Sequence, residues 1–539
     1  MKKPPERLDT TPEELDALVE QARTALDEAG YQKLKAAIRT LGYVTALLED
    51  QETTLQSLRN LLCQQRTEKT ADVLQRAGVN TKKPRTEPKP KAPGHGRHGA
   101  KAYRGGHKIH VTHASLKAGD RCPQCDRGKV YTQLDPGVLV RLIGRAPIEA
   151  TVYELEKLRC NLCGEVFTAK APDGVNEEEK YDVTVGSMIA VLRYGSGFPM
   201  HRLERMQAGL GIPLPASVQW EIVGAVAIHI TPVFDELIRQ AAQGDVLHND
   251  DTSMQVLSLR RDIDDEGAGS ERTGIFTSGI VSTREGRKIA LFFTGRQHAG
   301  ENLRDILVQR AATMRPPIQM CDALARNLPK MPEALEVIVS HCLAHSRRRF
   351  VEVTPNFPEA CRHVLEALGE VYHHDALAQK HGLSPDERLL LHQQRSSPVM
   401  DQLHVWLIAQ LEEKKVEPNS GLGGAITYLL KYWDRLTLFL RQAGAPLDNN
   451  ICERTLKRAI LHRKNSLFYK TENGAHVGDI FMSFIHTAEL CGANPFDYLT
   501  QLQRHADELK ENPIAVDAME LSYGSATCGC RHRLRLELS

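Results

Sequence analysis

Three acidic residues stand in sequence contexts that suit metal-dependent chemistry. Asp250 follows a run of alternating apolar residues, Asp322 follows Ile318-Gln319-Met320-Cys321, and Glu453 lies in a segment rich in Asn and Arg. Carboxylates on a rigid core are hard oxygen ligands that suit Mg²⁺ or Mn²⁺. Two such ions a few ångströms apart are the usual means of moving phosphodiester bonds. Together the three acids predict a metal site for phosphoryl transfer.

Each acid taken alone has a simpler interpretation. A single Asp after a strand is most often a turn residue or a cap. Glu453 can form an ion pair with Lys457, one helical turn further on. Asp251 stands beside Asp250, so the choice of ligand between the two stays open at this point. The acids become informative only with the elements that position them.

The segments around the acids predict a mixed sheet flanked by helices. Short β-rich runs occur at 246–248, 274–281, 288–293, 318–320 and 337–340, with helical stretches at 300–313 and 345–353. This order is typical of ribonuclease-H-like nucleases. Glu453 is expected on a helix that Asp448 or Asn449 caps, with Leu456 on the same face. The long interval before it predicts a helical insertion over 355–440.

Two Cys-x-x-Cys pairs predict a structural zinc site within a zinc ribbon at 116–172. They are Cys122 with Cys125, and Cys160 with Cys163. Four thiolates with this spacing suit tetrahedral Zn²⁺, and redox pairs are the alternative. The other eight of the twelve cysteines are scattered, as expected for buried thiols.

The N-terminal segment 1–75 is expected to be helical. Its leucines recur every seven residues, which favours a dimeric coiled coil over one amphipathic helix packed on its own protein. These leucines are Leu34, Leu41, Leu48, Leu55 and Leu62. The linker 76–115 that follows is basic and proline-rich and contains Arg97. It suits either a solvated spacer or an arm that tracks DNA phosphates.

Two further stretches are candidates for DNA contact. The helical segment 173–243, broken at 209–215, is either a relative of the helix-turn-helix or plain helical packing. Basic residues near Glu453 suit phosphate binding or a solvated helix face. These residues are Arg454, Lys457, Arg458, Arg463 and Lys464. His345, with Arg347 and Arg348, either reaches the scissile phosphate or caps and solvates a helix.

The overall composition is that of an ordinary globular protein. The 539 residues are 41% hydrophobic and 25% charged, with a net charge of +1. No apolar run approaches the length of a membrane span, and the N-terminus lacks the apolar stretch of a signal peptide. A cytoplasmic protein without membrane contact is therefore expected. Residues 506–539 form the C-terminal tail, and its last part, 520–539, is expected to be disordered.

Several segments together resemble one family of mobile-element enzymes. The stretches 248–252, 342–350 and 449–454 look like the insertion sequence 66 family of DDE transposases, as do 463–468 and 494–499. The zipper, the basic arm and the four-cysteine module resemble it too, so the likeness covers roughly residues 35–505. It implies an RNase-H-like core with Asp250, Asp322 and Glu453 as the metal-binding catalytic triad. Alignment of the motif selects Asp250 rather than Asp251.

The resemblance implies a DNA transposase that cleaves element ends and transfers strands with Mg²⁺ or Mn²⁺. The expected fold is multidomain α+β: a coiled-coil helix, a zinc ribbon, a helical DNA-binding segment and an RNase-H-like α/β catalytic core at 244–505 with the helical insertion. The expected partners are the terminal repeats, target DNA, a second copy or higher oligomer, and helper proteins from the same element. The alternatives are a catalytically idle DNA-binding regulator and an RNase-H-like nuclease.

Overall fold

The chain divides into two units, Met1–Thr81 and Lys82–Ser539. The computed structural model describes residues 20–21, 30–32, 34–35 and 69–79 of the first unit. In the second unit it describes residues 110–125, 127–132, 139, 141–142, 145–159, 161, 163, 165–172, 175, 180–260, 273–331 and 335–511. Most leucines of the predicted zipper, Arg97 of the basic arm, Cys160 and the tail beyond 511 therefore lie outside the described residues.

The described residues of the first unit are mainly helical. Helix α3 (Thr70–Arg76) buries Val73 and Leu74. Further towards the N-terminus, the side chains of Tyr31 and Lys35 both donate hydrogen bonds to Glu20. The described residues of this unit contain no proline, in agreement with their helical structure, and pairing of two chains stays a prediction.

A five-stranded mixed sheet organises the second unit. Its strands are β3 (Val246–Ser253), β4 (Phe276–Arg284), β5 (Arg287–Gly295), β6 (Ile318–Cys321) and β7 (Ile338–His341). Their spatial order is β5-β4-β3-β6-β7, with the first three antiparallel and β6 and β7 parallel to β3. All four residues of β6, including the polar Gln319, are buried, as expected for a parallel strand covered on both faces. The expected α+β class is confirmed.

Different helices cover the two faces of the sheet. Side chains alternate between faces along a strand. Gly279 of β4 faces Leu456 of α15 (Asn450–Ser466), whereas the neighbouring Ser278 accepts a hydrogen bond from Asn302 of α8 (Ala299–Leu307). Helices α15 and α8 therefore lie on opposite faces of β3 and β4.

Helix α16 (Glu472–Leu490) closes the open edge of the sheet at β5. Side chains four residues apart on α16 accept hydrogen bonds of 2.6–3.0 Å from alternate backbone N–H groups of β5: Asp479 from Thr294, Ser483 from Phe292, and Thr487 from Ala290. Four helical residues rise about 6 Å and two strand residues about 6.7 Å, so the two repeats match. An unpaired edge strand invites pairing with other chains, and α16 prevents it here.

The helices before the sheet belong to the same core as the sheet. They are α4 (Val183–Ala190), α5 (Met200–Gly209) and α6 (Ala216–Ala241), with the expected break after Gly209. Ile230 and Phe234 of α6 join Leu247 and Phe292 of the sheet in one hydrophobic cluster. Helices α17 (Pro495–Arg504) and α18 (Ala506–Glu511) follow α16, and Leu509 of α18 is fully buried in that cluster. The packed part of the chain thus continues past residue 505.

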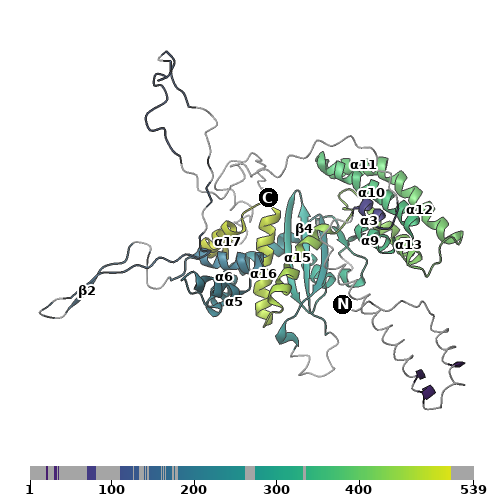
Figure 1. Cartoon of the computed structure of the whole chain (residues 1–539), viewed down its shortest axis with the longest axis horizontal. Helices are drawn as coiled ribbons and strands as arrows, with labels where there is room; N and C mark the ends of the chain where they lie inside the picture. The colour runs from purple at the N-terminus through teal and green to yellow at the C-terminus, as the bar shows by residue number, and fades with distance from the viewer. Residues whose placement is uncertain are drawn as a thin grey trace. The chain divides into compact units, whose positions relative to one another are not determined.

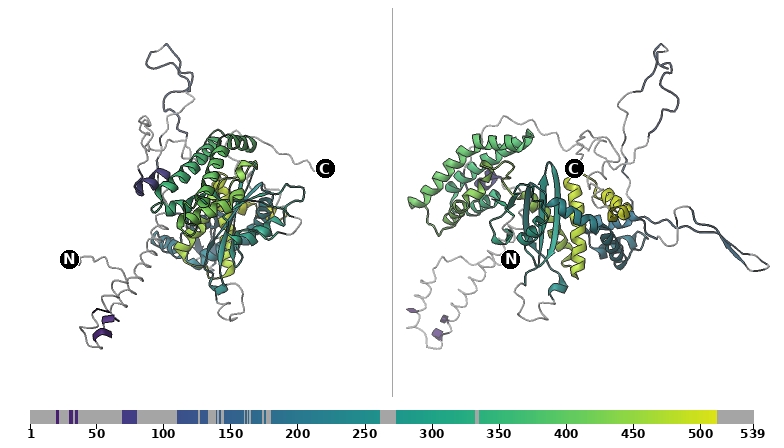
Figure 2. Two further views of the ribbon diagram at one scale, coloured as in Figure 1. Left: turned by 90° about the vertical axis from the view of Figure 1, so that its right-hand side faces the viewer. Right: turned by 180° about the vertical axis from the view of Figure 1, so that it is seen from behind.

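Helices fill the interval in which the sequence predicts an insertion. After α9 (Leu343–Val353) come α10 (Pro358–Lys380), α11 (Pro385–Leu391), α12 (Ser397–Glu412), α13 (Gly421–Lys431) and α14 (Trp433–Leu436). The side chain of Asp375 on α10 accepts a 2.7 Å hydrogen bond from Arg388 and lies 3.2 Å from His392, which ties α10 to the next turns. Figures 1 and 2 show α10–α13 on one side of the sheet and α5, α6 and α17 on the other.

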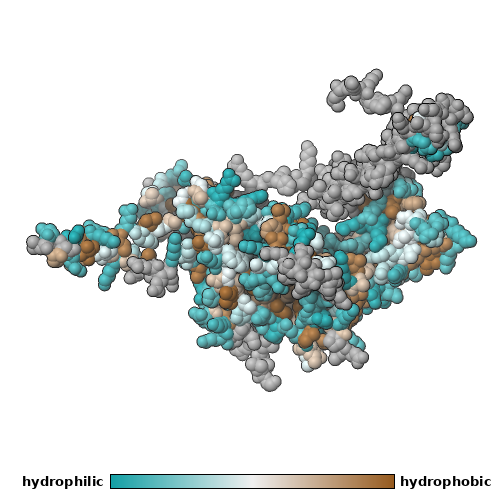
Figure 3. Space-filling view, turned by 90° about the horizontal axis from the view of Figure 1, so that it is seen from below, coloured by the Kyte–Doolittle hydropathy of each residue, from teal (hydrophilic) through white to brown (hydrophobic). Residues whose placement is uncertain are grey.

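No helix in the described part of the chain is long and apolar enough to cross a bilayer. The face drawn in Figure 3 is largely polar, with its apolar residues in separate small patches.

Candidate active site

The pleat of β3 separates the two adjacent acids, Asp250 and Asp251. Asp250 pairs in register with Gly279, so its side chain lies on the sheet face that α15 covers. Asp251 points to the other face, where its fully buried carboxylate lies 2.8 Å from His298 Nδ1 and 3.3 Å from Arg326 Nη2. Asp251 is therefore occupied by local ion pairs, while Asp250 faces the helix that carries Glu453.

Asp322 lies beside Asp250 because β6 runs parallel to β3. The carboxyl ends of adjacent parallel strands meet at one edge of a sheet, and Asp322 directly follows β6. The amide of Asn327 joins the two acids: its Nδ2 donates to Asp322 Oδ1 at 2.6 Å and to Asp250 Oδ1 at 3.2 Å. The two carboxylates therefore converge on one neutral donor.

Burial and like charge raise the pKa of Asp250. Desolvation is the larger cause and the charge of Asp322 the second, and together they raise the pKa of Asp250 to about 7. An amide satisfies one oxygen of each acid but cannot cancel their repulsion. A divalent cation between the two would do so, and its preferred ligands are carboxylate oxygens. These two residues thus fit the hard metal ion that the sequence predicts.

Glu453 stands in the first turn of α15, and Asn449 fixes where that helix begins. The buried Asn449 side chain lies 3.1 Å from His248 Nδ1 and donates to the carbonyl oxygen of Asn249 at 3.0 Å, both on β3. Of the two expected caps, Asp448 is the one that accepts the backbone N–H of Asn450. Asn449 instead attaches the start of the helix to the strand that carries Asp250.

Gly279 allows α15 to lie close to the sheet. A Cβ atom at this position would lie 2.9 Å from Cγ and Cδ2 of Leu456, which is closer than van der Waals contact permits. Cys452, between Leu456 and the helix start, donates its S–H to the Gly279 carbonyl oxygen at 3.2 Å. Burial raises the pKa of the Cys452 thiol, and the charges of Asp250 and Glu453 raise it further. The carboxylates of Asp250 and Glu453 are therefore both close enough to Cys452 to affect its thiol.

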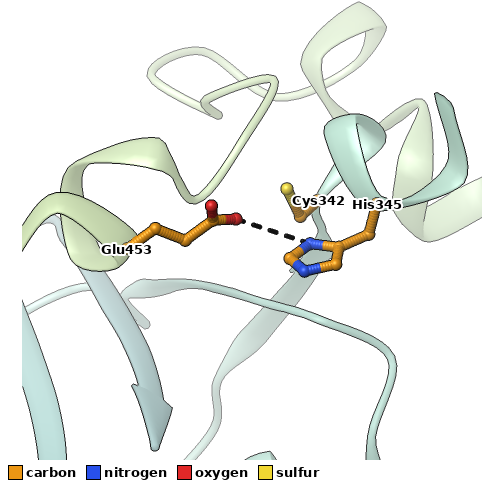
Figure 4. Close-up of side chains that lie close together, drawn as sticks. All are labelled: Cys342, His345 and Glu453. Carbon is orange, nitrogen blue, oxygen red and sulfur yellow. Dashed lines mark ion pairs between the residues drawn. The ribbon is translucent and has the colours of Figure 1, made fainter. Parts of the chain in front are cut away.

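The near neighbours of Glu453 are His345 and Cys342 at the start of α9 (Figure 4). His345 Nδ1 lies 3.8 Å from Glu453 Oε1. The thiol sulfur of Cys342, the imidazole nitrogen and the carboxylate oxygen all lie within 4.8 Å of one another. In the described part of the chain the ion pair of Glu453 is thus with His345.

A pocket of about 510 Å³ opens beside Asp322 and His345. Its other walls include Arg348 and Arg349 of α9, and Tyr428 of α13. The guanidinium of Arg349 lies 3.9 Å from the centre of the Tyr428 ring, a cation–π contact. The pocket therefore combines positive charge and aromatic surface next to a catalytic candidate.

The basic residues near Glu453 fall into two groups. Arg454, Lys457 and Lys464 are exposed and share one face of α15. Arg458 donates to the Gly195 carbonyl and to Glu489, and Arg463 donates to Thr252 and Ser253. The first group is available to an outside anion, whereas the second joins α15 to other elements.

The first cysteine pair adopts a tight turn. An isolated bridge pairs Arg121 with Lys129, and the Cys122 N–H donates to the Gly128 carbonyl at 2.8 Å. Backbone N–H groups of Gly128 and Arg127 lower the pKa of the Cys125 thiol, as does Cys122. Such donors favour a thiolate, the form that binds zinc.

Short antiparallel strands flank the second cysteine pair. They are β1 (Lys157–Arg159) and β2 (Val166–Thr168). Both cysteines of this pair fall between the two strands in the sequence. Cys163 is among the described residues, whereas Cys160 is not. The four-cysteine zinc site therefore stays a prediction.

Sequence reasoning missed Asn327 and the grouping of Cys342 with Glu453. Asn327 is a single amide in the unremarkable stretch Ala325-Arg326-Asn327, and no spacing marks it as a partner of the acids. Cys342 was grouped with the scattered thiols, since only the fold brings it to Glu453, 111 positions later in the chain. Residue type alone carried no signal for either contact.

Comparison with known proteins assigns more than half of the chain to one family. The family model described as "Transposase IS66 family" matches residues 180–477. The chain is also similar to three proteins of Sinorhizobium fredii (strain NBRC 101917 / NGR234) that carry the names uncharacterized protein y4jD, y4hP and y4qI. The identities are 27%, 25% and 23%, over 64%, 65% and 62% of this chain. The matches span 66%, 64% and 61% of those proteins, slightly less than two thirds of their length.

Proposed function

Because the chain belongs to the IS66 family of transposases, we propose that it cleaves DNA at the ends of an insertion element and joins the freed strands to target DNA. The observation that carries this proposal is the convergence of Asp250 and Asp322 on Asn327, below the helix that presents Glu453. The strand order β5-β4-β3-β6-β7 is the one expected of an RNase-H-like core. Asp250, Asp322 and Glu453 are then the catalytic triad.

The carboxylates of Asp250 and Asp322 would hold the metal ions, and Glu453 would complete the site. Bound Mg²⁺ or Mn²⁺ supplies Lewis-acid stabilisation of the attacking and leaving oxygens in an in-line displacement. The protein itself contributes positions: β3 and β6 set the separation of the first two acids, and Asn449 with Gly279 sets the distance of α15. Asn327 keeps both carboxylates turned towards each other before an ion arrives.

DNA is expected to lie across the exposed face of α15 and the pocket beside Asp322. Arg454, Lys457 and Lys464 present three positive charges to phosphates along that face. Arg348 and Arg349 in the pocket are placed to hold the phosphate next to the reacting one, and Tyr428 offers a ring on which an unpaired base can stack. We assign end recognition to the zinc ribbon and the basic arm that contains Arg97. Joining two ends requires two protomers, which the zipper would pair.

The first prediction tests the triad. Asp250→Asn, Asp322→Asn and Glu453→Gln each remove one ionised ligand with little change of shape. Each should lower cleavage of end-sequence DNA by about 100- to 1000-fold, as expected when transition-state charge stabilisation is lost. Cleavage and strand joining are measured separately with Mn²⁺, and DNA binding by a gel-shift assay. Binding should change less than about threefold.

Three other results would each point to a different function. DNA binding without cleavage by the unmodified chain would identify a regulator. Cutting without joining would identify a nuclease. Full cleavage by any of the three variants would exclude that residue from the triad.

A further inference from the structure

We propose that Cys342, His345 and Glu453 form a binding site for a transition metal ion of the Zn²⁺ or Co²⁺ class. The three donors come from two places in the fold: Cys342 and His345 from the start of α9, and Glu453 from the first turn of α15. Sγ, Nδ1 and Oε1 lie within 4.8 Å of one another and face a common point (Figure 4). This donor set differs in chemistry from the all-oxygen pair of Asp250 and Asp322.

Two of the donor atoms are buried without a hydrogen-bond partner in the described part of the chain. They are His345 Nδ1 and Glu453 Oε1. Their separation of 3.8 Å is too long for a hydrogen bond. Two ligands about 2.0–2.1 Å from one tetrahedral ion lie roughly 3.4 Å apart, so a small inward movement makes both atoms ligands. Binding an ion would remove the cost of burying two unsatisfied polar atoms.

The sulfur of Cys342 has the surroundings of a thiolate ligand. The backbone N–H of Asn449 donates to it at 3.2 Å, and the backbone N–H of His345 also faces it. Backbone donors around a metal-bound sulfur orient it and stabilise its negative charge. The Cys342-x-x-His345 spacing places both donors on the first turn of α9, whose free N–H groups add positive potential.

The donor types select the class of metal. Imidazole nitrogen and thiolate sulfur suit Zn²⁺ and its substitute Co²⁺, whereas Mg²⁺, Ca²⁺ and Mn²⁺ prefer oxygen ligands. The site is reachable, because the side chains of His345 and Glu453 are each about one quarter exposed and His345 lines the pocket beside Asp322. A fourth position stays open to water, a phosphate oxygen or a substrate hydroxyl.

Glu453 belongs to both this site and the proposed triad, which has a regulatory consequence. A Zn²⁺ ion bound by Cys342 and His345 would engage Glu453 Oε1 and withdraw it from the Asp250–Asp322 pair. Micromolar Zn²⁺ is then expected to inhibit Mn²⁺-supported cleavage. This consequence rests on the proposed function, whereas metal binding by the three residues does not.

Cobalt titration of the full chain tests the site without any activity measurement. Co²⁺ bound by a thiolate gives a sulfur-to-metal charge-transfer band, and d–d bands report tetrahedral geometry. The predicted four-cysteine site would also bind Co²⁺, so the readout is the number of ions per chain in matched variants. Cys342→Ala and His345→Gln should each bind one ion fewer than the unmodified chain.

Cys361→Ala serves as the matched control, because Cys361 is an equally buried cysteine in α10 away from the cluster. It should bind as many ions as the unmodified chain, with the same spectrum. Asp250→Asn removes a ligand of the all-oxygen pair, so it can lower the total count but should leave the Cys342 charge-transfer band unchanged. Thermal unfolding without metal verifies that each variant is folded. If folded Cys342→Ala and His345→Gln retain the full number of ions and the same spectrum, the cluster is only a His–Glu ion pair beside a thiol. If Asp250→Asn loses the same ion, the ion belongs to the triad.

Failure of this site and failure of the proposed function are distinguishable. A chain that loses cobalt with Cys342→Ala but never cuts DNA supports the metal site and removes the transposase proposal. A chain that cuts DNA while the variants bind every ion does the reverse.

Discussion

At the scale of single residues, the site depends on which face of β3 each acid occupies. Asp250 and Asp251 are neighbours in sequence, yet the pleat directs one to the metal side and the other to His298 and Arg326. The same strand thus supplies a reactive carboxylate and a structural one. Burial and the charge of Asp322 raise the pKa of Asp250 to about 7. An ion pair such as the one that Asp251 makes would oppose this rise, but Asp250 has no such cationic partner among the described residues.

Asn327 is expected to act by positioning the two acids. Its backbone carbonyl accepts hydrogen bonds from Asn249 and Gln319, and any residue at 327 retains those bonds. Asn327→Ala should therefore fold, but removing a residue that orients metal ligands typically costs 10- to 100-fold in metal affinity or activity. Cleavage rates as a function of Mn²⁺ concentration measure the effect. The exposed Asn419→Ala is the control, and equal behaviour of the two variants would remove Asn327 from the site.

The raised pKa of Asp250 makes metal binding depend on pH. Protons and metal ions compete for this carboxylate, so the apparent Mn²⁺ affinity should fall by up to about tenfold per pH unit below 7 and level off above it. Titration calorimetry in buffers of different ionisation enthalpy measures both the affinity and the proton released. A flat profile between pH 5.5 and 8 would contradict the assignment.

The same group changes stability in the metal-free chain. The folded-state pKa of about 7 exceeds the ordinary value of 3.8, so the fold binds this proton more tightly than the unfolded chain does. The resulting stabilisation is complete at acid pH and is lost as the pH rises towards 7. Buried Asp479, whose pKa is also raised to about 7 by desolvation, has the same sign. Comparison with Asp250→Asn in a metal chelator isolates the contribution of Asp250.

At the scale of elements, the proposed catalysis requires α15 to lie close to the sheet. The helix carries Glu453 and the exposed basic face. The side chains between the helix and strands β3 and β4 limit how closely the helix can approach the sheet. Asn449 holds the start of the helix against β3, and the missing side chain of Gly279 leaves room for Leu456. A small change at this contact would shift Glu453 relative to Asp250 on β3 and Asp322 after β6.

Gly279→Val is expected to push α15 outward, because even a Cβ atom would lie 2.9 Å from Leu456. Inserting bulk into a packed core typically costs 1–3 kcal/mol, and a displacement of about 1 Å at an active site can cost a hundredfold in rate. Thermal unfolding and cleavage are the measurements. Gly295→Ala is the matched control, since nothing lies within 4 Å of its added Cβ. Normal cleavage by Gly279→Val would show that the position of α15 is not limiting.

At the scale of the whole molecule, helices far apart in sequence share one core with the sheet. Helix α6 precedes the sheet and α16 to α18 follow it, yet Ile230, Phe481 and Leu509 belong to the same cluster. The helical segment before the sheet is therefore part of the structural support of the active site. The unit Met1–Thr81 forms its own set of contacts.

Two truncations test this division. A chain lacking residues 1–81 should keep the helical content and unfolding cooperativity of the second unit. A chain lacking residues 1–243 should not fold, because removing α6 exposes buried side chains that it covers, such as Phe484, which packs on Phe234 of α6; each is worth about 1.5–3 kcal/mol of burial. Circular dichroism and thermal melts separate the two. Cooperative unfolding of the shorter chain would show that the sheet folds without α4–α6.

Sequence alone was sufficient for the strands and for the helical interval after β7, and it singled out the three acids as candidates. Strand runs are continuous apolar or alternating stretches, and the period of two is a local property of the chain. The motifs around 250, 345 and 453 sufficed to suggest the family, which the match over 180–477 confirms. The local sequence pattern was enough to predict a feature wherever the residues that determine it are neighbours in the sequence.

Only the tertiary structure decided which polar groups meet. Asn327 bridging Asp250 and Asp322, Asn449 on β3 and Cys342 beside Glu453 all join residues brought together by parallel strand pairing and by the packing of α9 and α15. The sharing of one core by α6 and the sheet has the same origin. A side-chain contact across the fold depends on strand order and helix position, and neither is encoded in the spacing of the residues that touch.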